Sequence, residues 1–342
     1  MPTQPGVTRQ HVQASNARID GESYPRTAVF VGGTAGTGEL ALQELALTGK
    51  GKWAARIYVV GRSESASRVN KSLDRLQAQN PDVELIWTPG EASLLADVKR
   101  ICTEVKAKEK SLDLLFLSAG YAPLGGREET SEGLNVSQSL SHYSRILFIQ
   151  HLLPLLKAST TQGRVVSILG GGLETTRIDL DNLNFEKPGS FSGMKCQTHN
   201  LVMQSMAMEQ LAEDNKDVTF IHAYPGLVKT GNLNRGWRDR WFLQLLANIV
   251  LAPLFWIMAF SLEESKQRMF YLATSAKYGG HGVPLQEPVA PGLTSRGEET
   301  GSVFLVNHLC ATVTNEKVMA ELRKEAKGRI WAKTTEVTQP YI

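Results

Sequence analysis

The sequence predicts an α/β protein built on one doubly wound parallel sheet of about seven strands. Two observations lead to this prediction. Short apolar, β-branched runs alternate with segments of helical spacing, and the first such run ends in a glycine cluster. The 342 residues are 42% hydrophobic and 21% charged, which is typical of a globular protein with a large core.

The strands and helices can be placed in order along the chain. Strands are expected at 27–31, 56–60, 83–87, 112–117, 164–169, 218–222 and 302–306. Helices are expected at 40–47, 70–80, 93–108, 143–156 and 192–212. Because strands separated by helices must cross over to pair, this alternation favours βαβ units and a parallel sheet.

The chain is expected to form one domain, residues 26–342. Residues 1–25 are polar and lack an apolar signal run, which predicts a flexible N-terminal lead-in and a cytoplasmic protein. Residues 277–299 are rich in glycine and proline and predict a loop, and 313–342 predict a C-terminal helix and tail packed on the sheet edge.

Composition excludes several classes of protein. The net charge is +3, too small and too dispersed to suggest a nucleic-acid partner. Cys102, Cys196 and Cys310 are few and far apart, which excludes a disulfide scaffold or a CxxC metal site and suits a reducing compartment.

One segment, 241–262, has 22 residues without a charge. Its length qualifies it as a membrane span, but Pro253 interrupts it and strands of the same sheet are expected on both sides. We therefore expect an apolar helical lid over the active site, or a dimer-facing helical pair. Arg235, Arg238 and Arg240 lie beside it, so a lid that also dips into a membrane surface is the alternative.

The glycine cluster indicates a dinucleotide site. It follows the first strand and precedes a helix, where backbone N–H groups can bind a pyrophosphate at the helix N-terminus. A Rossmann-like fold uses its first βα turn in this way. The loop residues expected to bind the cofactor are Gly32, Thr34, Gly36, Thr37 and Gly38.

Arg62 follows the second strand, where such folds bind the adenosine ribose. An acid here would bind a free 2′-hydroxyl, whereas an arginine pairs with a 2′-phosphate. Arg62 therefore favours NADP(H) over NAD(H).

Two further motifs carry a family resemblance. Ser118-Ala119-Gly120 follows the fourth strand, and the segment 225–230, PGLVKT, follows the sixth. With the glycine turn, these motifs resemble the short-chain dehydrogenase/reductase family in order and spacing over about 27–306. The resemblance implies cofactor contacts at Glu91, Ser118, Ala119, Gly120, Lys195, Pro225, Gly226, Val228 and Thr230.

Other segments narrow the resemblance. The runs TSEGLN, SFSGMKC and FIHAYPGLVKTG look like a fungal branch that acts in specialised metabolism.

The catalytic residues depart from the family pattern. The tyrosine of its YxxxK motif is Phe191 here, while Lys195 is present. The family's serine position falls on Gly170, with Ser167 nearby, and its helix asparagine aligns near His142. The candidate catalytic residues are Lys195, Ser167, His142 and Tyr143, with Ser192, His199 and Tyr224 as further candidate proton donors.

The expected function is an NADPH-dependent oxidoreductase with an atypical active site. Its substrate would be a hydrophobic carbonyl or alcohol intermediate of secondary metabolite biosynthesis. Two alternatives stay open: a non-redox isomerase, cyclase or dehydratase on the same fold, and a nucleotide-binding pseudoenzyme. We expect no metal and no nucleic acid, and we consider a homodimer and a peripheral membrane contact through 241–262.

Overall fold

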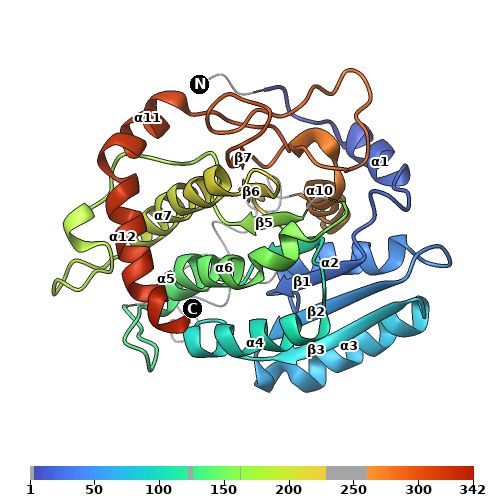
Figure 1. The fold of residues 1–342 in the computed structure, drawn as a ribbon, viewed down its shortest axis with the longest axis horizontal. Coiled ribbons are helices and arrows are strands. Elements are labelled where there is room, and N and C mark those ends of the chain that lie inside the picture. The colour runs from blue at the N-terminus through green and yellow to red at the C-terminus, as the bar shows by residue number, and fades with distance from the viewer. Residues whose placement is uncertain (1–3, 122–125, 162, 229–259) are drawn as a thin grey trace, which may run out of the picture.

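The computed structural model describes residues 4–121, 126–161, 163–228 and 260–342. A parallel sheet of seven strands runs through the molecule in the order β3-β2-β1-β4-β5-β6-β7, as the sequence predicts (Figure 1). Its strands are β1 Thr27–Val31, β2 Ala55–Gly61, β3 Val83–Pro89, β4 Leu114–Leu117, β5 Arg164–Ile168, β6 Thr219–Ala223 and β7 Phe304–Val306.

The strand order reverses between β1 and β4. Open α/β sheets bind ligands at such a switch point, outside the carboxyl ends of the strands. The register pairs Val31 with Leu117, the last residues of the two strands. Both strands therefore end at the same level, which brings the turns that follow them together.

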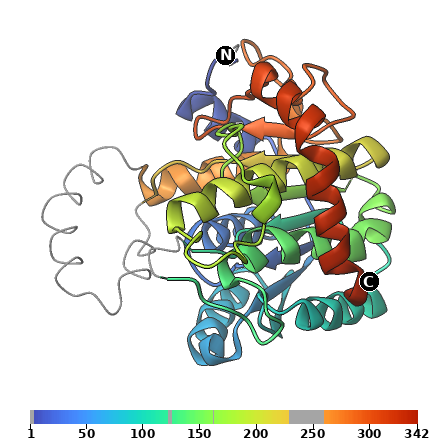
Figure 2. The ribbon, with the colours of Figure 1, turned by 90° about the vertical axis from the view of Figure 1, so that its left-hand side faces the viewer.

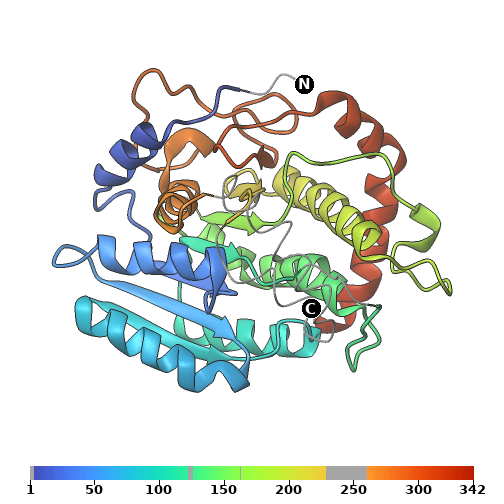
Figure 3. The same ribbon diagram turned by 180° about the vertical axis from the view of Figure 1, so that it is seen from behind.

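Helices cover both faces of the sheet. One face carries α1 Arg9–Ala17, α2 Gly36–Thr48, α3 Ala66–Gln79 and α10 Leu262–Thr274. Figure 3 shows α1 beside α10, and α10 beside α2. The other face carries α4 Leu95–Lys108, α6 Ser144–Lys157 and α7 Gly193–Asp214, with the short α5 Val136–Gln138 and a π turn at Ser139–Tyr143 before α6.

The N-terminal segment corrects the prediction of a flexible lead-in. Thr8 caps helix α1 by accepting a hydrogen bond from the His11 N–H. Val12 and Tyr24 are buried in the same apolar core as α10. The polar composition of 1–25 conceals these few anchors, which suffice to pack the segment against the domain.

The C-terminal tail also differs from the prediction. It forms α11 Glu316–Glu325 and α12 Lys327–Thr338, and α12 packs along α7 rather than on the sheet edge (Figure 2). Met319 and Ile330 are fully buried in the core on that side. The tail thus covers the outer side of the helical layer, because its apolar stripe matches one on α7.

Residues 241–259 of the predicted lid, 241–262, lie outside the described residues. At its end, Phe260 forms a parallel bridge with Val228, and α10 begins at Leu262. Within the part of the chain that the structure describes, no helix combines the length and the apolar character needed to cross a membrane.

Candidate active site

The turn after β1 and the end of β4 interlock at the switch point. Gly32 has a φ of +95°, and a Cβ there would lie 2.5 Å from the Ala119 nitrogen. A Cβ at Gly38 would lie 2.2 Å from Ser118 Oγ. Ser118 and Ala119 both donate their backbone N–H to Val31 O, at 2.8 and 3.0 Å. The structure therefore brings together two of the predicted motifs and excludes side chains at both glycines.

Helix α2 begins at Gly36, which has a φ of +68°. Ala35 precedes it and makes no side-chain hydrogen bond to the first turn. Backbone N–H groups there are available to an anionic ligand. Thr34 and Thr37 lie half-buried in this turn, and Arg68 Nη1 donates to Thr34 O at 2.9 Å. Arg68, on α3, thus holds the turn through a contact that the sequence did not suggest.

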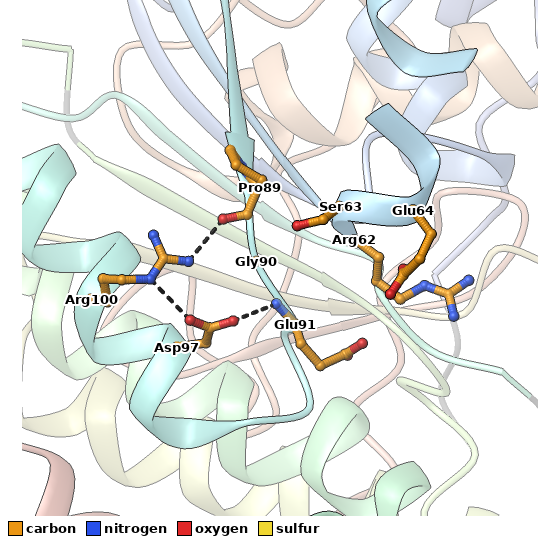
Figure 4. A pocket seen from close by; sticks show the side chains of 8 residues that line it. All are labelled: Arg62, Ser63, Glu64, Pro89, Gly90, Glu91, Asp97 and Arg100. Atoms are coloured by element: carbon orange, nitrogen blue, oxygen red, sulfur yellow. Dashed lines mark hydrogen bonds and ion pairs between the residues drawn. The ribbon is translucent and has the colours of Figure 1, made fainter. Parts of the chain in front are cut away.

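A pocket of about 390 Å³ opens between the ends of β2 and β3 (Figure 4). It is lined by Arg62, Ser63, Glu64, Pro89, Gly90, Glu91, Asp97 and Arg100. Arg62 is exposed and follows β2 directly. The two residues predicted to bind the adenosine end of a dinucleotide, Arg62 and Glu91, therefore line one pocket.

An ion pair fixes the far wall of this pocket. Arg100 Nε donates to Asp97 Oδ1 at 2.9 Å, and Arg100 Nη2 donates to Pro89 O at 2.8 Å. Asp97 Oδ2 accepts the Glu91 N–H at 2.7 Å. The Glu91 carboxylate accepts from both N–H and Oγ of Ser93, at 3.1 and 2.9 Å. These bonds hold the turn after β3 in one conformation.

The turn after β6 approaches the same edge. Gly226 has a φ of +74°, and a Cβ there would lie 2.8 Å from His308 Cβ. Pro225 is half-buried and Val228 is buried. Thr230, the remaining predicted contact of this motif, lies outside the described residues.

Lys195 lies in the first turn of α7 and is exposed. Its backbone N–H donates to Ser192 Oγ at 3.3 Å, so Ser192 is the helix cap. Phe191 packs edge-on against Phe185, with ring centroids 5.7 Å apart. Among the described residues, no ion pair or hydrogen bond engages Lys195 Nζ, which leaves it available to a ligand.

Ser167 is fully buried on β5. Its Oγ accepts a hydrogen bond from Arg145 Nη1 at 2.8 Å and one from Gln204 Nε2 at 3.3 Å. Contrary to the sequence prediction, Ser167 cannot touch a substrate in this structure. It lies next to the end of β5, where Arg145 of α6 and Gln204 of α7 cover its side chain.

His142 and Tyr143 are fully buried as well. His142 Nε2 lies 2.8 Å from Thr334 Oγ1, and burial lowers the pKa of the imidazole to about 3. The Tyr143 hydroxyl donates to Asn184 Oδ1, and burial raises its pKa. Both face the helices that cover the sheet, so the predicted catalytic role of each is corrected to a packing role.

Gly170, the family's serine position, opens a glycine turn. A Cβ at Gly170 would lie 3.2 Å from Leu201 Cβ, whereas one at the next residue, Gly171, would lie 1.8 Å from His222 O, so no side chain fits at Gly171. The Gly170 N–H donates to His222 Nε2, and His222 Nδ1 lies 2.7 Å from Ser205 Oγ. Ser205 Oγ donates in turn to Glu174 Oε1 at 2.7 Å. This buried chain of hydrogen bonds holds the turn where the family carries a hydroxyl.

Of the remaining predicted proton donors, His199 is buried and accepts the Asp179 N–H at Nε2. Tyr224 is half-buried just before Pro225. Tyr121 was not among the predicted candidates; it is half-buried directly after Ser118-Ala119-Gly120 and donates its hydroxyl to Glu128 Oε2 at 3.1 Å. Its place immediately after that motif is the signal that could have identified it.

The described residues contain no cluster of three His, Cys, Asp or Glu side chains that could hold a metal ion. The site therefore combines a glycine turn, an arginine-lined pocket, an exposed lysine and two half-buried phenols.

Relatives define the family. The chain is 37% identical to the oxidoreductase andH of Emericella variicolor, over 96% of each chain. It is 28% identical to the short-chain dehydrogenase/reductase SAT2 of Stachybotrys chartarum, over 90% of each. The chain belongs to the short-chain dehydrogenase/reductase family and is similar to its fungal oxidoreductases. No protein-family model matches it.

Solved structures agree on the fold. The Pseudomonas aeruginosa RhlG/NADP active-site complex superposes with a TM-score of 0.54 at 19% identity, over 78% of this chain and 94% of the other. A likeness at this level of identity supports the Rossmann-like architecture.

Proposed function

We propose that this oxidoreductase uses NADP(H) to interconvert a hydrophobic carbonyl compound and its alcohol. The observation that carries the proposal is the interlock of Gly32 and Gly38 with the end of β4, with Arg62 at the end of β2. The glycine turn provides backbone N–H groups for a pyrophosphate, and Arg62 provides a cation for a 2′-phosphate. The bound nicotinamide would supply or accept the hydride.

The chain's own residues orient the reactants. Lys195 is exposed at the start of α7, where its ammonium can bind the nicotinamide ribose hydroxyls. Phe191 provides no proton donor beside it. Tyr121 and Tyr224, at the carboxyl ends of β4 and β6, are the half-buried phenols that can donate a proton to the substrate oxygen.

The substrate side is apolar. Three large apolar side chains are exposed near the proposed site. Leu173 follows β5 and is 51% exposed, Met194 lies in the first turn of α7 and is 81% exposed, and Leu227 follows β6 and is 39% exposed. Exposed apolar side chains at these positions favour a hydrophobic substrate. The fungal relatives are oxidoreductases, which supports a redox reaction. A substrate from secondary metabolism and a cytoplasmic location stay predictions. The homodimer and the membrane contact through 241–262 stay predictions.

The first test is a fluorescence titration of the purified protein with NADPH, with NADH as the control. We expect NADPH to bind at least tenfold more tightly. The second test follows deuterium from 4-deuterated NADPH into products formed from a panel of hydrophobic ketones. Absence of binding by both nucleotides would refute the proposal.

Two phenylalanine variants then identify the proton donor. Tyr121→Phe and Tyr224→Phe each remove one hydroxyl and keep the ring. We expect the variant that removes the acid to lose about 100-fold or more in kcat, since a positioned acid contributes that much. The other variant is the matched control. Equal activity of both variants and the unaltered protein would exclude a phenol as the acid.

A non-redox reaction is the second candidate, favoured by Phe191 and the glycine turn at Gly170, where the family carries hydroxyls. An isomerase, cyclase or dehydratase would bind NADPH and convert its substrate without consuming the NADPH. Product that forms without deuterium transfer and without loss of NADPH absorbance would support this second candidate.

A further inference from the structure

Arg145 is a buried cation without a counter-ion among the described residues. Its side chain lies at the start of α6 and is 2% exposed. Nε donates to Leu140 O at 3.0 Å, and Nη1 donates to Ser167 Oγ at 2.8 Å and to Ile168 O at 2.9 Å. Nη2 donates to Ala119 O at 2.8 Å. Burial lowers the pKa of the guanidinium to about 9, so the group stays charged at neutral pH.

These bonds do not satisfy the whole side chain. A guanidinium has five N–H donors, and the four described bonds leave one donor of Nη2 unused. Ser141 Oγ, in the π turn before α6, is also buried, with no hydrogen-bond partner in the described structure. A native fold rarely leaves two such groups unpartnered.

Both groups face the same place. The Cβ that Gly120 lacks would lie 3.6 Å from Arg145 Nη2 and 3.8 Å from Ser141 Oγ. Beyond the residues adjoining Gly120, these are the described heavy atoms within 4 Å of that position. The result is a niche behind Gly120 whose walls are one cationic donor and one hydroxyl. We call it the Gly120 niche.

We propose that the Gly120 niche binds one water molecule. The water accepts a hydrogen bond from Arg145 Nη2 and shares one with Ser141 Oγ. Internal waters typically satisfy buried polar groups of this kind. Ser141 Oγ is inaccessible to solvent, which favours a trapped water over a solute that must enter from solution.

The proposed water completes the hydrogen bonds of the Arg145 guanidinium, which connects the ends of β4 and β5. Arg145 binds the carbonyl oxygens of Ala119, after β4, and Ile168, at the end of β5. Arg145 is therefore a positioning residue for the crevice that Gly120 borders. This second step rests on the proposed function, whereas the water site does not.

The water site is tested in the ligand-free protein with two matched serines. Ser141→Ala removes a partner of the water. Ser265→Ala removes a buried hydroxyl on α10 that likewise has no partner among the described residues. Ser265→Ala, on the other face of the sheet, measures the effect of losing a buried serine hydroxyl at a position away from Arg145. We expect Ser141→Ala to lower the thermal midpoint by about 1–2 °C more than Ser265→Ala does, because it also removes a partner of the water bound to Arg145.

A high-resolution crystal structure gives the direct answer. Density for a water within hydrogen-bond distance of both Arg145 Nη2 and Ser141 Oγ would confirm the site. An empty niche, with Ser141→Ala as stable as Ser265→Ala, would overturn it.

The positioning role has its own readout. We expect Ser141→Ala to weaken NADPH binding about threefold to tenfold, the equivalent of one lost hydrogen bond. A lower thermal midpoint with unchanged NADPH affinity would keep the water and overturn the positioning role. Failure of the unaltered protein to bind NADPH would refute the proposed function and leave the water site standing.

Discussion

Ser118 Oγ occupies the space that a side chain at Gly38 would need, since a Cβ at Gly38 would lie 2.2 Å from that oxygen. The glycine turn and the end of β4 are therefore one structural unit. A change in either motif must move the other, and with it the backbone N–H groups at the start of α2.

The first prediction tests this unit. Gly38→Ala should weaken NADPH binding about tenfold or more, because the turn must open to admit the methyl group. Adding Ser118→Ala should recover part of the loss, but not all, because Gly32 O would still lie 2.7 Å from the new Cβ. Gly328→Ala, on α12 in open space, is the matched control. Equal affinity of Gly38→Ala and the unaltered protein would contradict the interlock.

The second prediction concerns cofactor choice. Arg62→Ala should weaken NADPH binding about 10- to 100-fold, the range of one charge-assisted hydrogen bond, and leave NADH binding unchanged. Arg9→Ala, an exposed arginine on α1, should change neither. Parallel titrations with both nucleotides measure the ratio. An equal loss for NADPH and NADH would show that Arg62 does not read the 2′-phosphate.

The third prediction separates activity from stability at Lys195. The side chain is exposed, so Lys195→Met should leave the thermal midpoint nearly unchanged. We expect kcat to fall about 100-fold, because the variant loses the group that we propose orients the nicotinamide ribose. Thermal unfolding and steady-state kinetics on the same sample check both parts. A variant with full activity would remove Lys195 from the site.

The fourth prediction concerns the ion pair between Glu209 of α7 and Arg323 of α11, which we call the clamp. Glu209 is fully buried, and Arg323 binds both its oxygens, at 2.7 and 3.0 Å. Arg323→Ala should destabilise the protein by about 2–3 kcal/mol, because the buried carboxylate loses the cation that binds both its oxygens and keeps only Ser295 Oγ and the more distant Arg296 and Lys327. Lys324→Ala removes the cation of an exposed neighbouring pair and should have no measurable effect. Denaturant unfolding compares them, and equal stability would exclude the clamp.

The fifth prediction is a pH dependence of stability. Burial lowers the pKa of His142 to about 3, against an ordinary value of 6.5. The unfolded chain therefore binds a proton that the folded protein rejects as the pH falls from 6.5 toward 3. His142 alone should cost about 2 kcal/mol of stability between pH 7 and pH 5.

The variant His142→Gln isolates that contribution. Its stability should fall about 2 kcal/mol less than that of the unaltered protein over the same interval. The comparison is needed because His222 titrates in the same direction, while Glu174, whose pKa burial raises, opposes it. Identical pH profiles for variant and unaltered protein would show that His142 is not held neutral.

Local sequence signals predicted most of the fold. The β-branched runs, the helical spacing between them and the glycine cluster were sufficient for all seven strands and their parallel arrangement. Arg62 could be assigned to the cofactor edge because a residue at the end of a parallel strand must lie at that edge, and the family resemblance implied Glu91 there. Tyr121 could have been assigned by the same argument.

The catalytic half could not be predicted in this way. Ser167 lies within a strand, and its neighbours Arg145 and Gln204 come from helices before and after it in the chain. Their contacts depend on how the helices pack, which no local spacing records.

The sequence by itself therefore determined the layered α/β fold, the glycine turn after the first strand and the likeness to a family of oxidoreductases. Only the tertiary structure decided that α1 packs against α10, that α12 covers α7, and that Ser167, His142 and Tyr143 are buried. Strand order and turn geometry follow from short-range periodicity and steric limits. Burial and hydrogen-bond partners are set by segments that lie far apart in the chain and meet only in the folded core.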